Sequence, residues 1–154
     1  MRALLQRVQR CSVAINGNVQ SSVGSGLLIL LGVHANDTTI DAEYLAERCA
    51  ALRIFEDADG KMNLSITDVK GEAMVVSQFT LYGDTKKGNR PSYSDAAPSQ
   101  IAKALYEHFI LCLRKLLGSQ KVGTGVFGAM MDVELVNAGP VTLMIESKKQ
   151  APGE

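Results

Sequence analysis

The sequence predicts one α+β domain, in which a strongly curved, barrel-like and mostly antiparallel sheet is joined to two main helices. The chain has 154 residues, the size of a single domain, and 46% of them are apolar, which is enough for a packed core. Short apolar or alternating runs bounded by glycine occur at both ends of the chain, and two longer amphipathic segments lie between them. We expect the domain to cover residues 1–147 and a polar C-terminal tail to cover 148–154.

The first 34 residues predict three strands. Segment 2–16 mixes alternation with β-branched residues, and Asn16-Gly17 marks a tight hairpin turn before a second strand over 19–23. A glycine-flanked turn then leads into the apolar run 26–34, which is typical of a strand buried on both faces.

Two amphipathic helices are predicted, over 37–53 and 98–117. Asp37 is a suitable N-cap for the first, and Gly118 ends the second. The apolar periodicity predicts buried stripes of Ile40, Tyr44, Leu45, Cys49 and Leu52 on the first helix and of Ile101, Leu105, Phe109, Cys112 and Leu116 on the second.

The rest of the chain is predicted to consist of short strands and one long polar loop. A turn at 57–60 precedes strands that end with the run 73–83, and residues 83–98 form the loop. The last strands are predicted around 121–124, 131–136 and 141–146, followed by a frayed end at 150–154.

Charge and cysteine content exclude several classes of protein. Sixteen basic residues balance sixteen acidic ones, so the chain is not a polybasic nucleic-acid binder, although a local basic patch remains possible. Cys11, Cys49 and Cys112 are odd in number and far apart, which argues against a disulfide framework and favours a reduced, cytoplasmic protein. The longest apolar run, 27–31, is too short to cross a membrane.

No common catalytic motif is present. His34 and His108 are the only histidines, and neither belongs to a cluster with metal-ligand spacing, so we expect no metal and no cofactor. Neither a GxSxG elbow nor a nucleotide-binding glycine loop occurs, and the glycines of 123–128 are typical of a turn.

Two segments are unusual. Ser77, Gln78, Phe79 and Thr80 end an apolar strand, where they either alternate outward to solvent or present hydrogen-bond donors to a cleft. The second segment is 137–142, in which a Gly-Pro pair separates two predicted strands and by composition alone is most simply a turn.

These segments belong to a set of motifs that resembles the D-aminoacyl-tRNA deacylase family, also called the D-tyrosyl-tRNA deacylases. The most specific motifs are SQFTL at 77–81 and NAGPVT at 137–142, in the order that the family has them. The resemblance runs nearly the full length of the chain, through further matches at 3–8, 26–33, 53–55, 60–64 and 90–93.

The resemblance implies an enzyme that hydrolyses the ester between a D-amino acid and the terminal adenosine of tRNA. It implies a homodimer, with Gly139-Pro140 as a cis pair that reaches the partner subunit's active site. The carbonyls of this pair would bind the substrate's amino group and exclude an L-side chain by steric contact. Since glycine has no side chain to exclude, glycine mischarged on alanine tRNA should also be a substrate.

The remaining roles are also implied by the resemblance. The backbone N–H groups of Phe79 and Thr80 would stabilise the oxyanion, because no visible base could activate Thr80 as a nucleophile. The substrate's own 2′-hydroxyl would activate water. The other residues implied are Ser77 as a substrate contact, Gln78 at the adenosine end, Phe127 and Met131 along the adenine, and Arg7 as a brace for Gly139-Pro140.

Two alternatives remain open at this point. The chain could be a nucleic-acid-binding module without catalysis, which its neutral charge disfavours, or a purely structural dimer, which would not explain both motifs. Lys86, Lys87 and Arg90 in the long loop are either a solvated surface or the contact for the tRNA acceptor stem.

Overall fold

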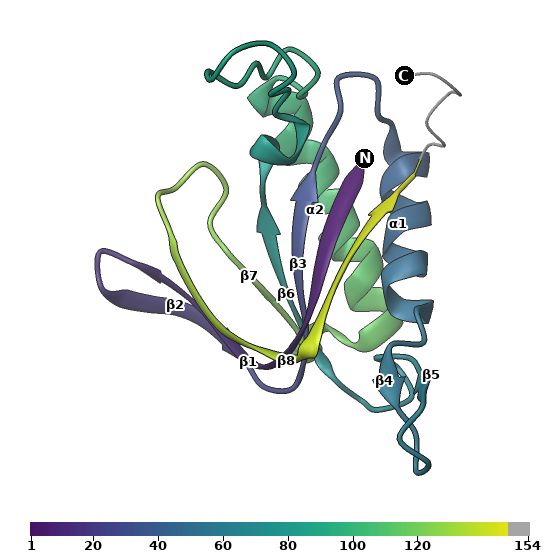
Figure 1. Cartoon of the computed structure of the whole chain (residues 1–154). Coiled ribbons are helices and arrows are strands. Elements are labelled where there is room, and N and C mark those ends of the chain that lie inside the picture. The colour runs from purple at the N-terminus through teal and green to yellow at the C-terminus, as the bar shows by residue number, and fades with distance from the viewer. Residues whose placement is uncertain (148–154) are drawn as a thin grey trace.

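A computed structural model describes residues 1–147, and the predicted tail 148–154 lies outside these described residues. One mixed sheet curves around the molecule, and two helices cover one of its faces (Figure 1). In chain order the elements are β1 (Arg2–Ile15), β2 (Asn18–Val23), β3 (Gly26–Gly32), α1 (Thr39–Ala51), β4 (Phe55–Glu56), β5 (Met62–Leu64), β6 (Glu72–Ser77), the 3₁₀ turn η1 (Phe79–Tyr82), α2 (Ser99–Leu117), the 3₁₀ turn η2 (Ser119–Lys121), β7 (Val122–Thr124) and β8 (Asp132–Glu146).

Strand β1 is the spine of the sheet. β8 pairs with it antiparallel from Arg2 to Ala14, so the other edge of β1 is left for β3 along its first half and β2 along its second half. The sheet nearly closes because β7, at its far end, approaches β2. A Cβ built on Gly123 of β7 would lie 2.6 Å from the Ser21 Oγ of β2, so a larger residue here would force the Ser21 side chain to move.

The sheet is mostly antiparallel, as predicted, because β1 pairs antiparallel with β2, β3 and β8, but it also has a parallel part that the sequence did not indicate. β3, β6 and β7 are parallel neighbours in the order β2-β1-β3-β6-β7. Parallel strands need a crossover, and the two predicted helices provide it: α1 lies in the connection from β3 to β6, and α2 in the connection from β6 to β7.

Two hydrophobic clusters lie on the two faces of the sheet. The helix side holds fully buried Leu45 of α1 and Phe109 and Leu113 of α2, together with side chains of β1, β3 and β6. The inner, concave side holds a smaller cluster of Val8, Cys11, Val13, Val23, Leu28, Met74 and Val76. No helix within residues 1–147 is long and apolar enough to cross a membrane.

Both helices differ from the prediction in their details. α1 begins after Thr38, whose N–H donates to Asp41 Oδ2 at 2.8 Å, while Asp37 accepts the N–H of His34 at 2.6 Å. Four residues predicted to be buried are instead exposed: Ile40 (73%), Tyr44 (46%), Ile101 (44%) and Leu116 (43%).

Two strand boundaries also correct the prediction. The run 73–83 is a strand only to Ser77, after which Phe79–Tyr82 forms a 3₁₀ turn. The segments 131–136 and 141–146 are a single strand, β8, and Gly139-Pro140 is part of it rather than a turn between two strands.

Candidate active site

The segment Ser77–Thr80 lies at the carboxyl end of β6, where the chain leaves the sheet. The Gln78 N–H donates to Leu31 O of the parallel strand β3 at 2.8 Å, which fixes the point of departure. Phe79 and Thr80 then begin the 3₁₀ turn, and within the described residues their N–H groups have no backbone acceptor. The first N–H groups of a helical turn lack internal partners, so two donors point away from the turn at this strand end.

In the same segment Phe79 and Thr80 are exposed to solvent, whereas Ser77 and Gln78 are half-buried. The Gln78 amide Nε2 donates to Thr80 Oγ1, and the Phe79 ring is 55% exposed. His34 instead has its ring 5.3 Å from that of Tyr82, and His108 is bonded to Glu43 at 3.0 Å between the helices. Within the described residues, neither histidine hydrogen-bonds to Thr80.

The long loop 83–98 is held against this strand end. The Tyr93 ring contacts Phe79 edge-on with 5.1 Å between ring centroids, and Asp84 and Ser92 exchange two backbone hydrogen bonds of 2.7 and 2.9 Å. These two bonds hold the base of the loop together. The exposed cations Lys86, Lys87 and Arg90 lie on the part of the loop beyond them. The sequence did not indicate Tyr93 as a site residue, because its contact with Phe79 is a tertiary contact that no local sequence pattern predicts.

Gly139 and Pro140 form a bulge in β8 directly opposite Arg7. Gln6 pairs with Thr142 and Val8 with Asn137, so residues 138–141 all face Arg7. The Gly139-Pro140 peptide is cis, as predicted. The Arg7 side chain is 12% exposed and donates from Nε to Ala138 O at 3.1 Å and from Nη1 to Ile54 O at 2.8 Å. It thereby connects the bulge to the chain just before β4.

The structure does not bring the two motifs together within one chain. Gly139 lies opposite Arg7, which pairs with Leu27, whereas Ser77 pairs with Leu31, so the two sites are about 13 Å apart along the strands. β1 and β3 also lie between β8 and β6, which adds roughly 14 Å across the sheet. Figure 1 shows the same separation, with the bend of β8 at the bottom and the end of β6 near the top.

Phe127 and Met131 lie on the segment after β7, which is the parallel neighbour of β6. The Met131 sulfur accepts the N–H of Val126 at 3.4 Å, and its side chain packs on the inner cluster. Phe127 lies on the helix side, with its ring 5.8 Å from that of Tyr106. The two side chains therefore lie on opposite sides of this segment, and their place beside the adenine stays a prediction.

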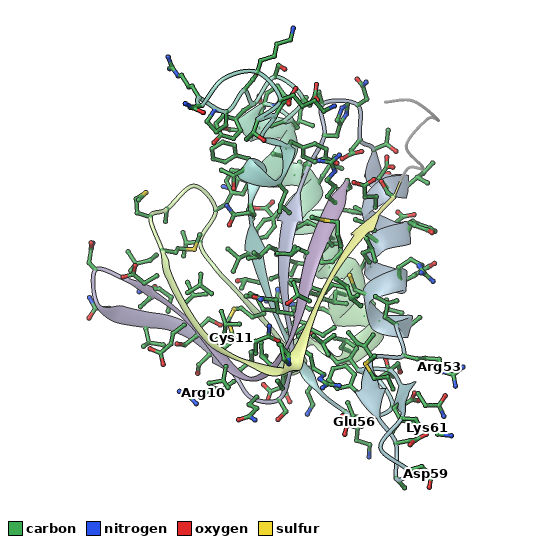
Figure 2. All side chains as sticks on the ribbon, in the orientation of Figure 1. Arg10, Cys11, Arg53, Glu56, Asp59 and Lys61 are labelled. Carbon is green, nitrogen blue, oxygen red and sulfur yellow. The ribbon has the colours of Figure 1, made fainter. Side chains whose placement is uncertain are left out.

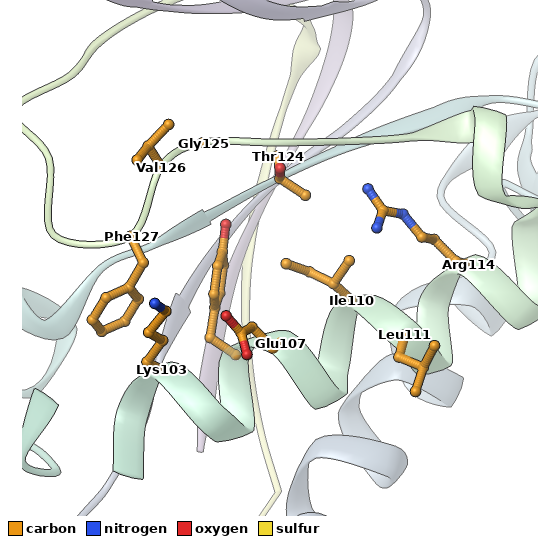
Figure 3. A pocket seen from close by; sticks show the side chains of 10 residues that line it. Lys103, Glu107, Ile110, Leu111, Arg114, Thr124, Gly125, Val126 and Phe127 are labelled. Atoms are coloured by element: carbon orange, nitrogen blue, oxygen red, sulfur yellow. The ribbon is translucent and has the colours of Figure 1, made fainter. Parts of the chain in front are cut away.

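A pocket opens on the helix side of this segment, between α2 and residues 124–127 (Figure 3). Lys103, Glu107 and Arg114 of α2 line it together with Phe127. Sequence reasoning missed these three charged residues, since a charged helix face is most often only solvated.

Burial opposes ionisation of the thiols and of two tyrosines. It raises the pKa of Cys11 to about 11 and that of Cys49 to about 12. It likewise raises the pKa of Tyr106, whose hydroxyl donates to Val75 O at 3.1 Å, to about 12, and it raises the pKa of Tyr82. These groups stay neutral near pH 7, so none of them is a ready anionic nucleophile.

The fold matches those of solved structures over nearly its whole length. A structure entitled "Structural Analysis of a probable eukaryotic D-amino acid tRNA deacylase" has a TM-score of 0.82 at 17% identity, covering 94% of this chain and 98% of that one, and at this identity it shows the fold alone. A structure of a "c-Myc DNA Unwinding Element Binding Protein" has a TM-score of 0.93 at 39% identity, covering 97% of this chain and 100% of that one.

The chain therefore has the same curved-sheet fold as both solved structures. Residues 4–146 match the family described as D-Tyr-tRNA(Tyr) deacylase, and the chain belongs to this family. It is 55% identical to a "D-aminoacyl-tRNA deacylase" of Thermosipho melanesiensis, over 97% of this chain and 99% of the relative. It is 57% identical to a protein of the same name from Desulfatibacillum aliphaticivorans, over 96% of this chain and 100% of the relative.

Proposed function

We propose that this protein hydrolyses D-aminoacyl-tRNA to free D-amino acid and tRNA, as a step of chiral proofreading in translation in the cytoplasm. The observation that carries the proposal is family membership over 4–146, with relatives above 50% identity that bear the name D-aminoacyl-tRNA deacylase. Both specific motifs, SQFTL at 77–81 and NAGPVT at 137–142, are complete in this chain.

The proposed reaction takes place at the end of β6. Water adds to the ester carbonyl carbon, and the N–H groups of Phe79 and Thr80, which lack backbone acceptors, stabilise the oxyanion. The bond from this carbon to the ribose 3′-oxygen then breaks, and the oxygen leaves with a proton as the tRNA hydroxyl. The 2′-hydroxyl of the substrate orients and activates the water, since neither histidine hydrogen-bonds to Thr80 within the described residues.

A second copy of the chain completes the proposed site. The Gly139-Pro140 bulge lies on the order of 20 Å from Ser77 within one chain, so a site that uses both must draw them from two subunits. We propose a homodimer in which Gly139-Pro140 of one subunit excludes L-side chains from the other subunit's site. Glycine has no side chain for Gly139-Pro140 to exclude, so glycine on alanine tRNA is a further proposed substrate.

Other residues are proposed to hold the nucleic acid. Ser77 contacts the substrate, Gln78 positions its terminal adenosine, and Phe127 and Met131 line the adenine. Lys86, Lys87 and Arg90 are exposed on the loop next to Phe79, where they are placed to meet phosphates of the acceptor stem.

A non-catalytic DNA-binding role is the second candidate, because the similar structure at 39% identity bears the name of a DNA-unwinding-element binding protein. The balance of sixteen cations and sixteen anions gives this candidate little electrostatic support.

One assay separates the two functions. Purified protein is mixed with tRNA charged with D-tyrosine or with L-tyrosine, and release of the free amino acid is followed. Rapid release of D-tyrosine alone supports the deacylase. Binding of duplex DNA without release of either amino acid would replace it with the second candidate.

A further inference from the structure

The pocket beside Phe127 has a volume of about 570 Å³, and its walls differ in chemistry. One wall is aromatic, with the rings of Tyr106 and Phe127 5.8 Å apart and inclined by 45°. The other is a row of charged side chains on α2: Lys103, Glu107 and Arg114, at positions i, i+4 and i+11. Figure 3 shows Lys103 next to Phe127, and Arg114 reaching in from the far end toward Thr124.

None of these three charges is neutralised by an ion pair within the described residues. Arg114 donates from Nη2 to Val122 O at 3.4 Å, but its Nε is buried and has no hydrogen-bond partner. This Nε is inaccessible from the pocket, so the donor that the guanidinium can offer a ligand is Nη1, which has no hydrogen bond within the described residues. The pocket therefore has free donors at one end, a free carboxylate in the middle and a cation at the other end.

We propose that this pocket binds the cytidylate that precedes the terminal adenosine at the 3′ end of tRNA, an inference that rests on the proposed deacylase function. Phe127 connects this pocket to the proposed adenosine site, because it is proposed to line the adenine and also forms a wall of the pocket. The nucleotide next to the adenosine in the single-stranded 3′ end is a cytidine in every tRNA, and the phosphate between the two would lie near Phe127.

The lining matches a cytosine base. Flipped-out single-stranded bases bind proteins by stacking on aromatic rings and by hydrogen bonds along the Watson–Crick edge. The Glu107 carboxylate accepts from the exocyclic N4 amino group, and the Arg114 guanidinium donates to N3 and O2. Lys103, beside Phe127, is placed to meet the connecting phosphate.

The same arrangement disfavours uracil. Uracil presents O4 where cytosine presents its amino group, so two acceptors would face each other at Glu107. It also carries N3–H where cytosine has an acceptor, which opposes the Arg114 donors. The pocket should therefore distinguish cytidine from uridine at this position of the tRNA.

In the test, the full-length protein is given three substrates, and kcat/KM is measured for each. They are D-tyrosyl-tRNA with the normal cytidine, D-tyrosyl-tRNA with uridine at that position, and D-tyrosyl-adenosine. We expect the wild type to prefer cytidine over uridine by about tenfold, the usual size of one matched base contact. Glu107→Gln should reduce this preference to about twofold, because an amide also donates to the uracil O4.

The variant Arg114→Met tests the free donor. We expect it to lower the ratio of kcat/KM for D-tyrosyl-tRNA over that for D-tyrosyl-adenosine by about tenfold, since the short substrate has no base to bind. Lys115→Met removes an exposed cation of the same helix outside the pocket and is the matched control, with an unchanged ratio. If Arg114→Met does not fold, Lys103→Met, at an exposed position, gives the same comparison.

The outcomes separate this inference from the proposed function. If the wild type hydrolyses neither D-tyrosyl substrate, the deacylase proposal fails and the inference fails with it. If the wild type hydrolyses D-tyrosyl-tRNA but treats cytidine and uridine alike, and the pocket variants match Lys115→Met, the cytidylate site is wrong and the deacylase remains.

Discussion

Arg7 of β1 donates from its Nε to the carbonyl oxygen of Ala138 of β8, 3.1 Å away, at the residue that precedes Gly139. A second donor of the same guanidinium, Nη1, bonds to Ile54 O at 2.8 Å. The nearly buried Arg7 side chain thus fixes the position of the Gly-Pro bulge relative to the chain before β4. The planar fork of arginine makes both bonds at once, which a lysine ammonium on a flexible stem cannot reproduce.

Replacing Arg7 should therefore loosen the bulge. We expect Arg7→Met to lower the free energy of unfolding by about 2–4 kcal/mol, since two carbonyls lose charged donors. The ratio of D- to L-tyrosyl-tRNA hydrolysis should also fall, and Arg7→Lys should restore little of it. Arg10→Met, which removes an exposed arginine of β1, is the control (Figure 2 shows Arg10 beside Cys11). Unchanged selectivity in a folded Arg7→Met protein would remove Arg7 from the proposed chiral gate.

Thr80 should be dispensable as a nucleophile. Its N–H carries the proposed role, and its hydroxyl accepts a hydrogen bond from the Gln78 amide rather than donating to a base. We expect Thr80→Ala to keep kcat within about tenfold of the wild type, whereas loss of a true nucleophile costs on the order of 10⁴-fold or more. Single-turnover hydrolysis of D-tyrosyl-tRNA measures this. A covalent aminoacyl group trapped on Thr80 would show that the backbone account is wrong.

The fold could be predicted from local patterns, and the parts that could not depend on tertiary contacts. Nearly every strand was predicted from glycines and apolar runs. The buried face of α1 was not, because it contains Ala42, Ala46 and Ala50, and the prediction relied on large apolar residues. The predicted stripe therefore included Ile40, which is 73% exposed. The parallel pairing of β3, β6 and β7 was missed because strand direction depends on the crossovers, which no single segment encodes.

The candidate site was predicted through its motifs rather than its geometry. No pattern in the sequence shows that Gly139-Pro140 lies inside a continuous strand, because the bulge exists only against Arg7 of β1. Tyr93 and the charged face of α2 were missed for a similar reason. Each acquires a role only beside Phe79 or Phe127, which lie far away in the sequence.

The loop cations should produce a modest salt dependence. We expect log kcat/KM for D-tyrosyl-tRNA, below saturation, to fall with log salt concentration by roughly 0.7–0.9 for each phosphate that is neutralised. Replacing Lys86, Lys87 and Arg90 together by alanine should flatten this slope. The control replaces the exposed cations Arg10, Lys61 and Lys115, with Lys61 on the β4–β5 hairpin far from the end of β6 (Figure 2). Equal slopes for the two triple variants would exclude the loop from the tRNA interface.

Activity should not depend on a metal ion. Within residues 1–147, histidine, cysteine and carboxylate side chains form no group of three that could hold one. Hydrolysis of D-tyrosyl-tRNA is measured before and after dialysis against a strong chelator, with the tRNA refolded in magnesium beforehand. We expect equal rates, and restoration of a lost rate by one added metal would refute the proposed metal-free site.

The sharpest prediction concerns Gly139. Its φ is +123°, where an L-residue is strained, and a Cβ there would lie 2.8 Å from Arg7 Nη2, 3.0 Å from Val141 Cγ2 and 3.2 Å from the Val141 backbone nitrogen. Arg7 could shift, but the backbone nitrogen and the stiff valine could not, so Gly139→Ala must move the bulge and its carbonyls. Gly17→Ala is the matched control, because Gly17 also has a positive φ, +79°, but open space around its Cβ position.

Both alanine variants should lose about 1–2 kcal/mol of unfolding free energy from backbone strain, and Gly139→Ala should lose more because of its contacts. Only Gly139→Ala should also lose D-tyrosyl-tRNA hydrolysis and admit L-tyrosyl-tRNA, because only this substitution displaces the carbonyls proposed to bind the substrate's amino group. The measurement is the ratio of the two hydrolysis rates in proteins shown to be folded and of the same oligomeric state. A Gly139→Ala protein with the wild-type ratio would mean that the bulge takes no part in chiral selection, whatever its shape.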